Sequence, residues 1–314
     1  MAYGSPADEA DIERYYTHIR GGRKPSDEAL AELTERYRAV GGSPLTEITK
    51  AQAAALGERL GMPAFVGMKH AAPFIADGAA EAKKAGIERL VGLPLAPHFA
   101  DMSLGAYERT LASAWDGELI FVRGFHDHPR FIDAVVALIS ERLAEAPAER
   151  LFFTAHSLPA RIVAEGDPYA DRLLESCRLV EAKIQLPDWE FAFQSASTTG
   201  EPWLGPDLLV AIEGSAARDV LVCPIGFVAD HIEVVWDLDN ELRSIAEAQG
   251  IAFARAATPN DDRRFARLAA DLIDELRLGR PPARVSGRDP VPGCLASVNG
   301  AACRPPHCAA ACDG

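Results

Sequence analysis

The sequence lacks any apolar run of the roughly twenty residues that a membrane span requires, and its N-terminus lacks the hydrophobic segment of a signal peptide. It also lacks a basic run, and its formal net charge at pH 7 is −14. This excludes nucleic acid as the main partner, because no cluster of lysines and arginines is present to neutralise phosphates. We therefore expect a cytoplasmic globular protein, and the 25% of charged residues is typical of that class.

Three common catalytic motifs are also missing. The chain has no G-x-S-x-G turn for a hydrolase serine, no G-x-x-x-x-G-K-[ST] phosphate loop and no G-x-G-x-x-G after a strand. Cysteine is scarce in the body of the chain, where only Cys177 and Cys223 occur, whereas the other four of the six cysteines lie close to the C-terminus. That distribution indicates a metal site rather than a disulfide framework.

Apolar runs of strand length alternate with helical patterns along the whole chain. Strands are predicted at 64–67, 89–95 and 119–123 in the first half and at 151–155, 190–194, 220–223 and 251–255 in the second, and Met1 to Tyr3 resembles the end of a further strand. The alternation predicts an α/β fold of two domains, each a four-stranded parallel sheet flanked by helices, with a cleft between them. The expected division is 1–123 and 124–255 for the domains, 256–280 for a C-terminal helix and 281–314 for a linker and cysteine-rich tail.

The segment from Val220 to Glu241 has the clearest pattern. A short apolar strand is followed by a Pro-Ile-Gly turn, and Asp230 is the expected N-cap of the next helix. Glu233, Asp237 and Glu241 fall four residues apart, which at 3.6 residues per turn places three carboxylates on one face. A solvated outer face is the alternative interpretation. Because the row starts at the carboxyl end of a strand, where open α/β sheets bind ligands, we favour a functional role.

His156 directly follows the apolar strand predicted at 151–155. Because parallel strands end at the same edge of a sheet, we expect His156 and Glu233 to lie close together. An imidazole with an ordinary pKa of about 6.5, placed beside a carboxylate, suits proton transfer or the binding of a divalent metal. The first half offers polar groups that would receive carboxylates of a ligand at the other lip of the cleft. They are Tyr3, Arg20, Arg36, Lys69 and His70.

Many separate motifs resemble those of the ferrochelatase family, and in particular its coproporphyrin branch from Gram-positive bacteria. The motifs are MAYGSP, FVGMKHAAPFI, LAPHF, FTAHSLP, GDPY, FQSASTTGEPWLGPD and PIGFVADHIEVVWDLDNE. The resemblance implies two flavodoxin-like (Rossmann-type) domains around a porphyrin cleft, with the C-terminal helix returning to the first domain. It also implies a lyase-class metal chelatase of heme biosynthesis that inserts Fe²⁺, its substrate, into coproporphyrin III.

The resemblance also implies roles for single residues. His156 and Glu233 match the catalytic, metal-side pair, and Asp237 and Glu241 match carboxylates that lead the metal inward. The expected porphyrin-binding residues are Tyr3, Arg20, Arg36, Tyr37, Ser43, Lys69, His70 and Tyr107. Four propionates on coproporphyrin III would use more of these groups than the two on protoporphyrin IX, so we favour the former. Insertion into protoporphyrin IX, a cobalt chelatase and a non-catalytic tetrapyrrole or metal carrier are the alternatives.

The tail carries Cys294, Cys303, Cys308 and Cys312. Four cysteines at this spacing suit an iron–sulfur cluster or zinc, and His307 keeps zinc open. The tail resembles that of actinobacterial ferrochelatases, which implies a [2Fe-2S] cluster as cofactor. Beyond coproporphyrin III and Fe²⁺, the expected partners are other enzymes of the heme pathway in transient contact, and the expected state is a monomer.

Overall fold

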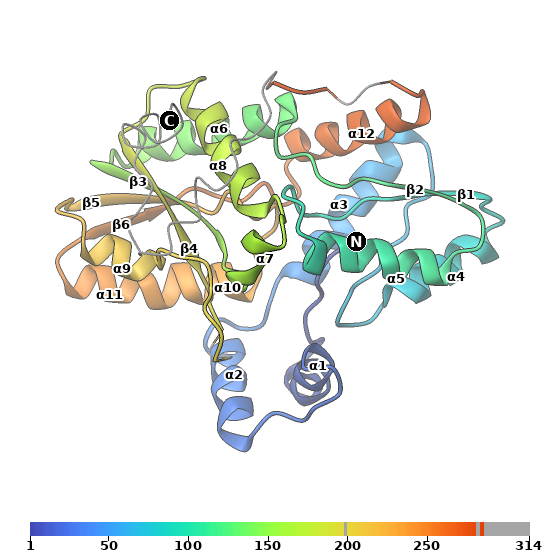
Figure 1. Ribbon diagram of the computed structural model, residues 1–314, viewed down its shortest axis with the longest axis horizontal. Helices are drawn as coiled ribbons and strands as arrows, with labels where there is room; N and C mark the ends of the chain where they lie inside the picture. Colours follow the sequence, from blue (N-terminus) through green and yellow to red (C-terminus); the bar gives the residue numbers. More distant parts are fainter. Residues whose placement is uncertain (198–199, 281–282, 286–314) are drawn as a thin grey trace.

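The computed structural model describes residues 1–197, 200–280 and 283–285. The chain folds into an α/β structure with two separate parallel sheets, each flanked by helices (Figure 1). The predicted fold class is therefore confirmed. The larger sheet has the strand order β4-β3-β5-β6. Its strands are β3 (Arg150–His156), β4 (Asp188–Gln194), β5 (Asp219–Cys223) and β6 (Ala252–Arg255).

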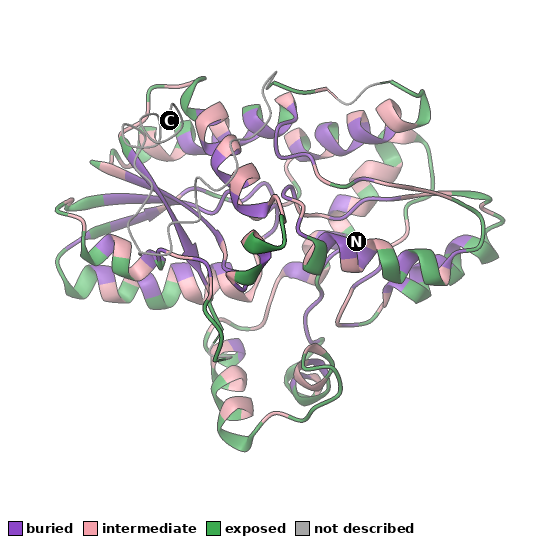
Figure 2. Ribbon diagram, in the orientation of Figure 1, coloured by how far each residue is buried: buried purple, intermediate pink, exposed green. Residues whose placement is uncertain are grey.

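The larger sheet is buried on both faces, as Figure 2 shows for β3, β4 and β5. Along β3, Leu151 and Phe153 point into one apolar cluster while Phe152 points into another. This alternation is the period of two expected for a strand. Because helices cover both faces, the strands read as continuous apolar runs, which is typical of parallel sheets.

The smaller sheet has only two regular strands among the described residues, β1 (Arg89–Gly92) and β2 (Glu118–Phe121). The prediction of four strands for the first half was wrong in this respect. The Met1 to Tyr3 segment does pair like a strand, because Ala2 donates to the Gly67 carbonyl at 3.2 Å and Leu95 donates to the Met1 carbonyl at 2.8 Å. The predicted strand 64–67 is not a regular strand. Next to it, Met68 forms single bridges with Ala2 and Phe74.

Helices surround both sheets (Figure 1). The last long helix packs against α3 and α6, and so it joins segments that are far apart in the sequence. The domain boundaries stay a prediction. The helices are α1 (Ile12–Ile19), α2 (Asp27–Ala39), α3 (Leu45–Leu60), α4 (Ile75–Lys84), α5 (Ala106–Ala114), α6 (Pro129–Glu145), α7 (Arg161–Ala164), α8 (Tyr169–Glu181), α9 (Leu208–Glu213), α10 (Ile232–Val235), α11 (Arg243–Ala248) and α12 (Arg263–Arg277). Shorter or wider helical turns are η1 (Glu9–Asp11), η2 (Asp101–Gly105) and η3 (Asp237–Leu242).

Helices α1 and α2 project away from the two sheets (Figure 1). They contact each other, and most of their residues are exposed or only partly buried (Figure 2). Within the described residues, no helix combines the length and the apolar character needed to cross a membrane.

Candidate functional site

The candidate site begins where β3 and β5 end side by side. These strands pair in parallel, so the residues that follow them emerge at one edge of the sheet. The turn after β5 folds back onto β3, and the Gly226 amide donates to the Thr154 carbonyl at 3.2 Å. A Cβ atom at Gly226 would lie 2.4 Å from the Cβ of Ala155, so only glycine allows this close approach. The turn thereby directs the segment containing Glu233 toward His156.

Glu233 lies between two histidines. Its Oε1 is 3.5 Å from Nε2 of His156, and its Oε2 is 3.4 Å from Nε2 of His231. In both rings Nδ1 faces a backbone carbonyl, that of Ser157 for His156 and that of Ala229 for His231. A carbonyl only accepts, so Nδ1 carries the proton in each ring and Nε2 is directed toward the carboxylate. Each Nε2 then either bears a second proton or offers a lone pair to a metal.

The charges of this group depend on one another. Burial lowers the pKa of His156, but the Glu233 charge, their hydrogen bond and the Ser157 carbonyl outweigh it and raise that pKa to about 9. Burial opposes ionisation of Glu233, yet His156 and His231 hold its pKa well below the ordinary value. At neutral pH the resting pair is therefore an imidazolium and a carboxylate. The pKa of His156 therefore lies above the ordinary value of about 6.5 for an imidazole.

Two residues at the end of β4, Gln194 and Ser195, donate hydrogen bonds to residues of the carboxylate row. Gln194 Nε2 donates to the backbone carbonyl of Glu233 at 2.7 Å, which fixes the start of α10. Ser195 has a φ of 59°, a left-handed conformation that is uncommon for serine, and its hydroxyl donates to Asp237. Burial and the Glu233 charge raise the pKa of Asp237 to about 6, although Ser195 and Arg36 act in the opposite direction. Asp237 therefore exchanges a proton close to neutral pH.

The predicted regular helix through Glu233, Asp237 and Glu241 is interrupted. Helix α10 has only four residues, and the next turn, η3, is π-helical, with the Glu241 amide donating to the Trp236 carbonyl at 2.8 Å. A π-turn is wider than an α-turn and is frequent at functional sites. The charges of Glu233 and Glu241 both act on Asp237, so the row persists, and Glu241 is its exposed end.

The helix also begins differently from the prediction. His231, rather than Asp230, is the N-cap residue of α10. Asp230 instead accepts hydrogen bonds from Thr258, Asn260 and Arg255. These partners come from the segment at and after β6, which the sequence pattern does not connect with Asp230.

Several residues predicted for the porphyrin side gather around Tyr3. The Tyr3 ring lies 4.5 Å from the His70 ring, and His70 Nδ1 is 3.0 Å from His18 Nδ1. Lys69 Nζ lies 5.7 Å from the centre of the Tyr107 ring, which is itself buried. Burial, the Lys69 charge and His18 lower the pKa of His70 to about 3. His70 is thus neutral at pH 7.

The metal-side group, formed by His156, Glu233 and Asp237, lies close enough to Tyr3 for their charges to interact. Burial raises the pKa of Tyr3 above its ordinary range, and the Glu233 charge adds to that effect. Arg36 bridges from α2 toward the carboxylates, at 2.7 Å from Glu32 and 4.0 Å from Asp237. The structure therefore brings His156, Glu233, Asp237 and Arg36 into one region. Tyr3 is close enough for the Glu233 charge to affect its pKa.

Of the remaining predicted residues, Tyr37 belongs to the same region, because burial and the Glu233 charge both raise its pKa. Arg20 and Ser43 contact residues of α1 and α3. Arg20 is exposed at the end of α1 and stacks over Tyr16 at 5.7 Å. The Ser43 hydroxyl accepts from the Leu45 amide at 3.4 Å at the start of α3. Tyr37 is buried beside Tyr15, with ring centres 6.4 Å apart.

His231, Ser195 and His18 also lie at the site, and none of them was among the predicted site residues. The signal for His231 was its position two residues before Glu233. No sequence signal links His18 to His70 across 52 residues.

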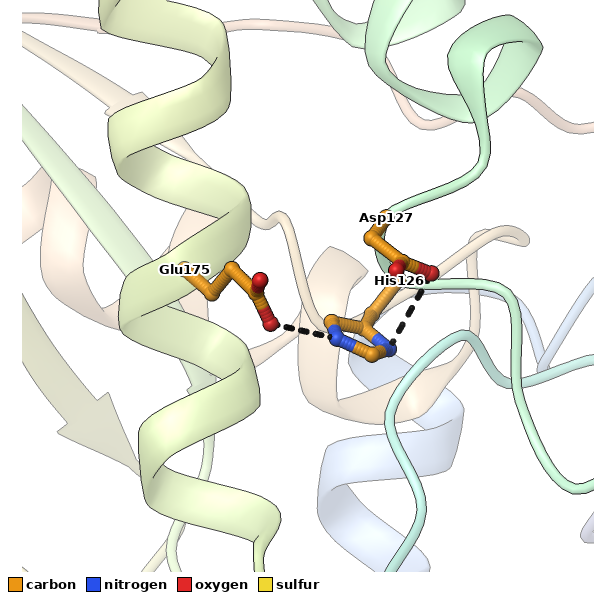
Figure 3. A group of neighbouring side chains, drawn as sticks. All are labelled: His126, Asp127 and Glu175. Atoms are coloured by element: carbon orange, nitrogen blue, oxygen red, sulfur yellow. Dashed lines mark hydrogen bonds and ion pairs between the residues drawn. The ribbon is translucent and has the colours of Figure 1, made fainter. Parts of the chain in front are cut away.

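A second group of potential metal ligands lies outside this site. Atoms of His126, Asp127 and Glu175 lie within 4.8 Å of one another (Figure 3). His126 Nε2 is 2.8 Å from Glu175, and Asp127 forms an ion pair of 3.2 Å with Arg284. Burial lowers the pKa of Arg172, with Arg284 adding to the decrease and Asp127 and Glu175 opposing it. Because arginines balance its carboxylates, this group forms a buried ion network, and we assign no metal to it.

Two of the six cysteines lie within the residues that the structure describes. Cys177 and Cys223 are buried in the same apolar cluster, and burial raises the pKa of both thiols. Neither is suited to supply a thiolate ligand there. The four predicted cluster ligands lie outside the described residues. They are Cys294, Cys303, Cys308 and Cys312.

Solved structures identify the class of fold. The sirohydrochlorin chelatase SirB from Bacillus subtilis, solved with Fe³⁺, superposes with a TM-score of 0.52 over 74% of this chain and 91% of that chain, at 14% sequence identity. The related cobalt complex gives a TM-score of 0.51 over 72% of this chain and 88% of that chain, at 12% identity. This chain therefore shares the fold of SirB.

Sequence comparison gives the family. The sequence model of the ferrochelatase family matches residues 1–276. A coproporphyrin III ferrochelatase from Mycolicibacterium paratuberculosis is 42% identical over 100% of this chain and 98% of its own length. One from Mycobacterium bovis is 41% identical over 99% of this chain and 94% of its own length. The chain belongs to the ferrochelatase family.

Proposed function

We propose that the chain inserts Fe²⁺ into coproporphyrin III to form its iron complex, in heme biosynthesis. The observation that carries this proposal is the carboxylate of Glu233 between the Nε2 atoms of His156 and His231, at 3.5 and 3.4 Å. The relatives named coproporphyrin III ferrochelatase support the choice of porphyrin. In the reaction the ring loses two pyrrole protons as Fe²⁺ binds its four nitrogens. The residues must therefore deliver a cation and remove protons at the same place.

His156 is the proposed proton acceptor, and Glu233 sets when it accepts. In the resting pair His156 already holds a proton, because its pKa is about 9. A cation at Glu233 replaces the imidazolium as partner of the carboxylate. The support for the raised pKa is then lost, and His156 returns toward the ordinary value of about 6.5. His156 thus releases its proton to solvent as the metal arrives, accepts one pyrrole proton, and passes it to solvent before it accepts the second.

Asp237 and Glu241 are the proposed path of the metal to Glu233. Glu241 is exposed, Asp237 is half-buried, and both charges act in the same row. Carboxylate oxygens suit a hard divalent cation, and shared charge repulsion keeps each site weak enough to release it. Arg36, at 4.0 Å from Asp237, limits the net negative charge of the row.

The porphyrin is proposed to lie between this group and Tyr3. Arg20, Arg36, Lys69, Ser43 and the ring of Tyr37 would hold it and its propionates, and Lys69 Nζ lies 5.7 Å from the centre of the Tyr107 ring. His70 is neutral at pH 7 and adds a hydrogen-bonding group that does not repel a cation. We further propose a monomeric lyase-class enzyme in the cytoplasm, in transient contact with other enzymes of the pathway.

The test is the rate of anaerobic Fe²⁺ insertion, followed by absorbance, with coproporphyrin III and with protoporphyrin IX. The expected result is turnover of coproporphyrin III at a higher kcat/KM, and its loss in His156→Ala. The matched control is His126→Gln, which changes a histidine of the buried network and retains a hydrogen-bonding group for Glu175. Equal rates for the unsubstituted chain and His156→Ala would overturn the mechanism. Preference for protoporphyrin IX would overturn the substrate.

We also propose that the four tail cysteines hold a [2Fe-2S] cluster, with zinc as the alternative. Cysteine thiolates are the usual ligands of such clusters, and the buried body cysteines are poor candidates to replace them. Iron, sulfide and zinc analysis of the purified chain decides between the two. Loss of the bound metal in Cys308→Ser, with retention in Cys177→Ser, is the expected pattern.

A further inference from the structure

Arg255, the last residue of β6, lies between two aspartates that stand on either side of the metal-side residues in the sequence. Its Nε and Nη2 donate to the two carboxylate oxygens of Asp239, at 2.8 and 2.7 Å, and its Nη1 donates to Asp230 at 3.3 Å. Asp230 precedes α10, and Asp239 lies within η3. Glu233 and Asp237, which we propose for the metal, therefore lie between two points that one arginine holds.

The bond between Arg255 and Asp239 fixes direction as well as distance. Two parallel hydrogen bonds from a guanidinium to one carboxylate do this, and the single ammonium group of lysine cannot replace them. The Arg255 side chain is only 12% exposed, so solvent ions screen these contacts little. Arg255 pairs in register with Val222 of β5, one residue before that strand ends. The arginine therefore emerges beside the turn that leads to α10.

The π-helical turn η3 is tied to β6 a second time. Within this turn the Glu241 amide donates to the Trp236 carbonyl at 2.8 Å. The Asp239 carbonyl accepts from the side-chain Nε of Arg243 at 3.2 Å, and Nη1 of Arg243 donates to the Phe253 carbonyl of β6 at 3.2 Å. A side chain that enters the helical hydrogen-bond ladder is a known cause of an irregular helix. The side chain and the carbonyl of Asp239 are thus both linked to β6.

Asp230 and Asp239 differ in how much they depend on Arg255. The Asp230 carboxylate also accepts from Thr258 at 2.9 Å and from Asn260 at 3.1 Å, and the Asp230 amide donates to Asn260 at 2.7 Å. The Asp239 carboxylate has its two short contacts with Arg255, and Arg243 lies 3.7 Å from it. Loss of the Arg255 guanidinium would therefore free η3 more than the start of α10.

We propose that Arg255 is a positioning residue for the metal. It holds η3 against β6, so that Asp237 keeps the position relative to Glu233 from which a divalent cation passes between their carboxylates. This inference rests on the proposed function, because iron insertion makes the carboxylate row a path for the metal. The effect is expected on the cation and not on the porphyrin, since neither Asp230 nor Asp239 is proposed to bind the porphyrin.

The test compares Arg255→Lys with Arg264→Lys in the full chain. Arg264 also bridges two carboxylates, Asp262 at 2.6 Å and Glu141 at 2.8 Å, but it lies in α12, outside the metal-side segment. Zn²⁺ binding, with free Zn²⁺ buffered, is followed by the ring ¹⁵N signals of His231. Arg255→Lys should weaken it about tenfold or more, the usual effect of losing a residue that orients metal ligands. Arg264→Lys should stay within about twofold of the unsubstituted chain.

Equal Zn²⁺ affinity in the two variants would overturn the inference. Urea denaturation of both gives the loss of stability from each arginine, which a purely structural role would share. If Arg255→Lys does not fold, Asp239→Asn replaces it, because the amide keeps one acceptor oxygen for Arg255. Asp239→Asn should weaken Zn²⁺ binding about three- to tenfold, the range for one lost hydrogen bond to a charged group. Unchanged affinity in Asp239→Asn would also contradict the inference.

Steady-state kinetics separate the cation from the porphyrin. Arg255→Lys should raise KM for Fe²⁺ about tenfold and leave KM for coproporphyrin III within about twofold. Equal increases in both KM values would overturn a role in positioning the metal. A failure of the unsubstituted chain to insert Fe²⁺ would overturn the proposed function instead, and the Zn²⁺ titration would still decide whether Arg255 orients the carboxylates.

Discussion

The metal-side group around His156 and Glu233 and the buried network of His126, Asp127 and Glu175 both combine histidine with carboxylates, and they differ in access. In the metal-side group the side chains of His156 and Glu233 are 30% and 28% exposed. In the buried network those of His126, Asp127 and Glu175 are 6%, 6% and 13% exposed (Figure 3). The residue types are the same. Only the first group can receive a cation and release a proton without a change of fold.

The two groups also differ in how their charges are balanced. Asp127 is paired with Arg284, and Glu175 lies 2.8 Å from His126, so both carboxylates already have hydrogen-bonded partners. Glu233 lies 3.4 Å from His231 and is balanced by the His156 imidazolium at 3.5 Å, which can give up its proton. An arginine stays charged at any working pH, whereas an imidazolium does not. A donor set therefore indicates a working metal site only when its counter-charges can leave.

The largest expected effect is on catalysis by the metal-side group. His156→Ala should lower kcat for iron insertion by about 10²- to 10⁴-fold, the usual range for loss of an acid–base group. Initial rates from absorbance measure it. His126→Gln should stay within a few-fold of the unsubstituted chain. A larger loss of kcat in His126→Gln than in His156→Ala would contradict the assignment of the two groups.

Glu233→Gln should lower kcat by about 10²-fold, because the amide neither attracts Fe²⁺ nor sustains the exchange of metal for proton. Its effect on the fold should be small, since Gln194 still holds the backbone carbonyl at 2.7 Å. Steady-state kinetics at several Fe²⁺ concentrations measure the change. An unaltered kcat would show that the carboxylate has no part in the reaction.

The buried network should respond in stability instead. His126→Ala leaves Glu175 without its 2.8 Å partner, and we expect a loss of about 2 kcal/mol in the free energy of unfolding. Urea denaturation gives the value, with His156→Ala as the comparison. A loss in His126→Ala no larger than in His156→Ala would argue against the network as a structural element.

The smallest effect concerns pH. The folded pKa of Asp237 is about 6, above its ordinary value of 3.8, so the folded state binds more protons than the unfolded state between these values. The contribution of Asp237 to the free energy of unfolding therefore falls as pH rises from about 4 to 6. Above pH 6 the full destabilisation is present. Asp237→Asn should remove this slope and gain on the order of 1 kcal/mol at pH 7. Urea melts at pH 4 and pH 7 test it, and a variant that is less stable at pH 7 would contradict it.

The sequence was sufficient to predict that His156 and Glu233 meet, because both follow strands of one parallel sheet and strand ends share an edge. It was not sufficient for the wide turn η3, since the spacing of four between the carboxylates fits an α-turn and a π-turn almost equally. The π-turn is visible only in the backbone bond from Glu241 to Trp236. The partners of Asp230 and the His18–His70 contact depend on tertiary packing, which local patterns do not encode.

The number of strands predicted for the smaller sheet was too high for a related reason. Residues 64–67 are apolar enough for a strand, but Gly67 lies against Ile75, where an added Cβ would come within 2.8 Å of its Cα. The chain turns sharply there toward α4, and pairing is limited to single bridges. An apolar run of strand length is therefore not sufficient to predict a regular strand.

The most direct test of the central claim is histidine-ring ¹⁵N NMR of the full chain, titrated with Zn²⁺ as a diamagnetic substitute for Fe²⁺. Before addition, His156 should titrate with a pKa of about 9. Zn²⁺ at pH 7 should shift the His156 and His231 ring signals, with loss of the His156 proton, and leave the His126 signal unchanged. A response that starts at His126, or a His156 ring that keeps its proton at saturating Zn²⁺, would contradict the account.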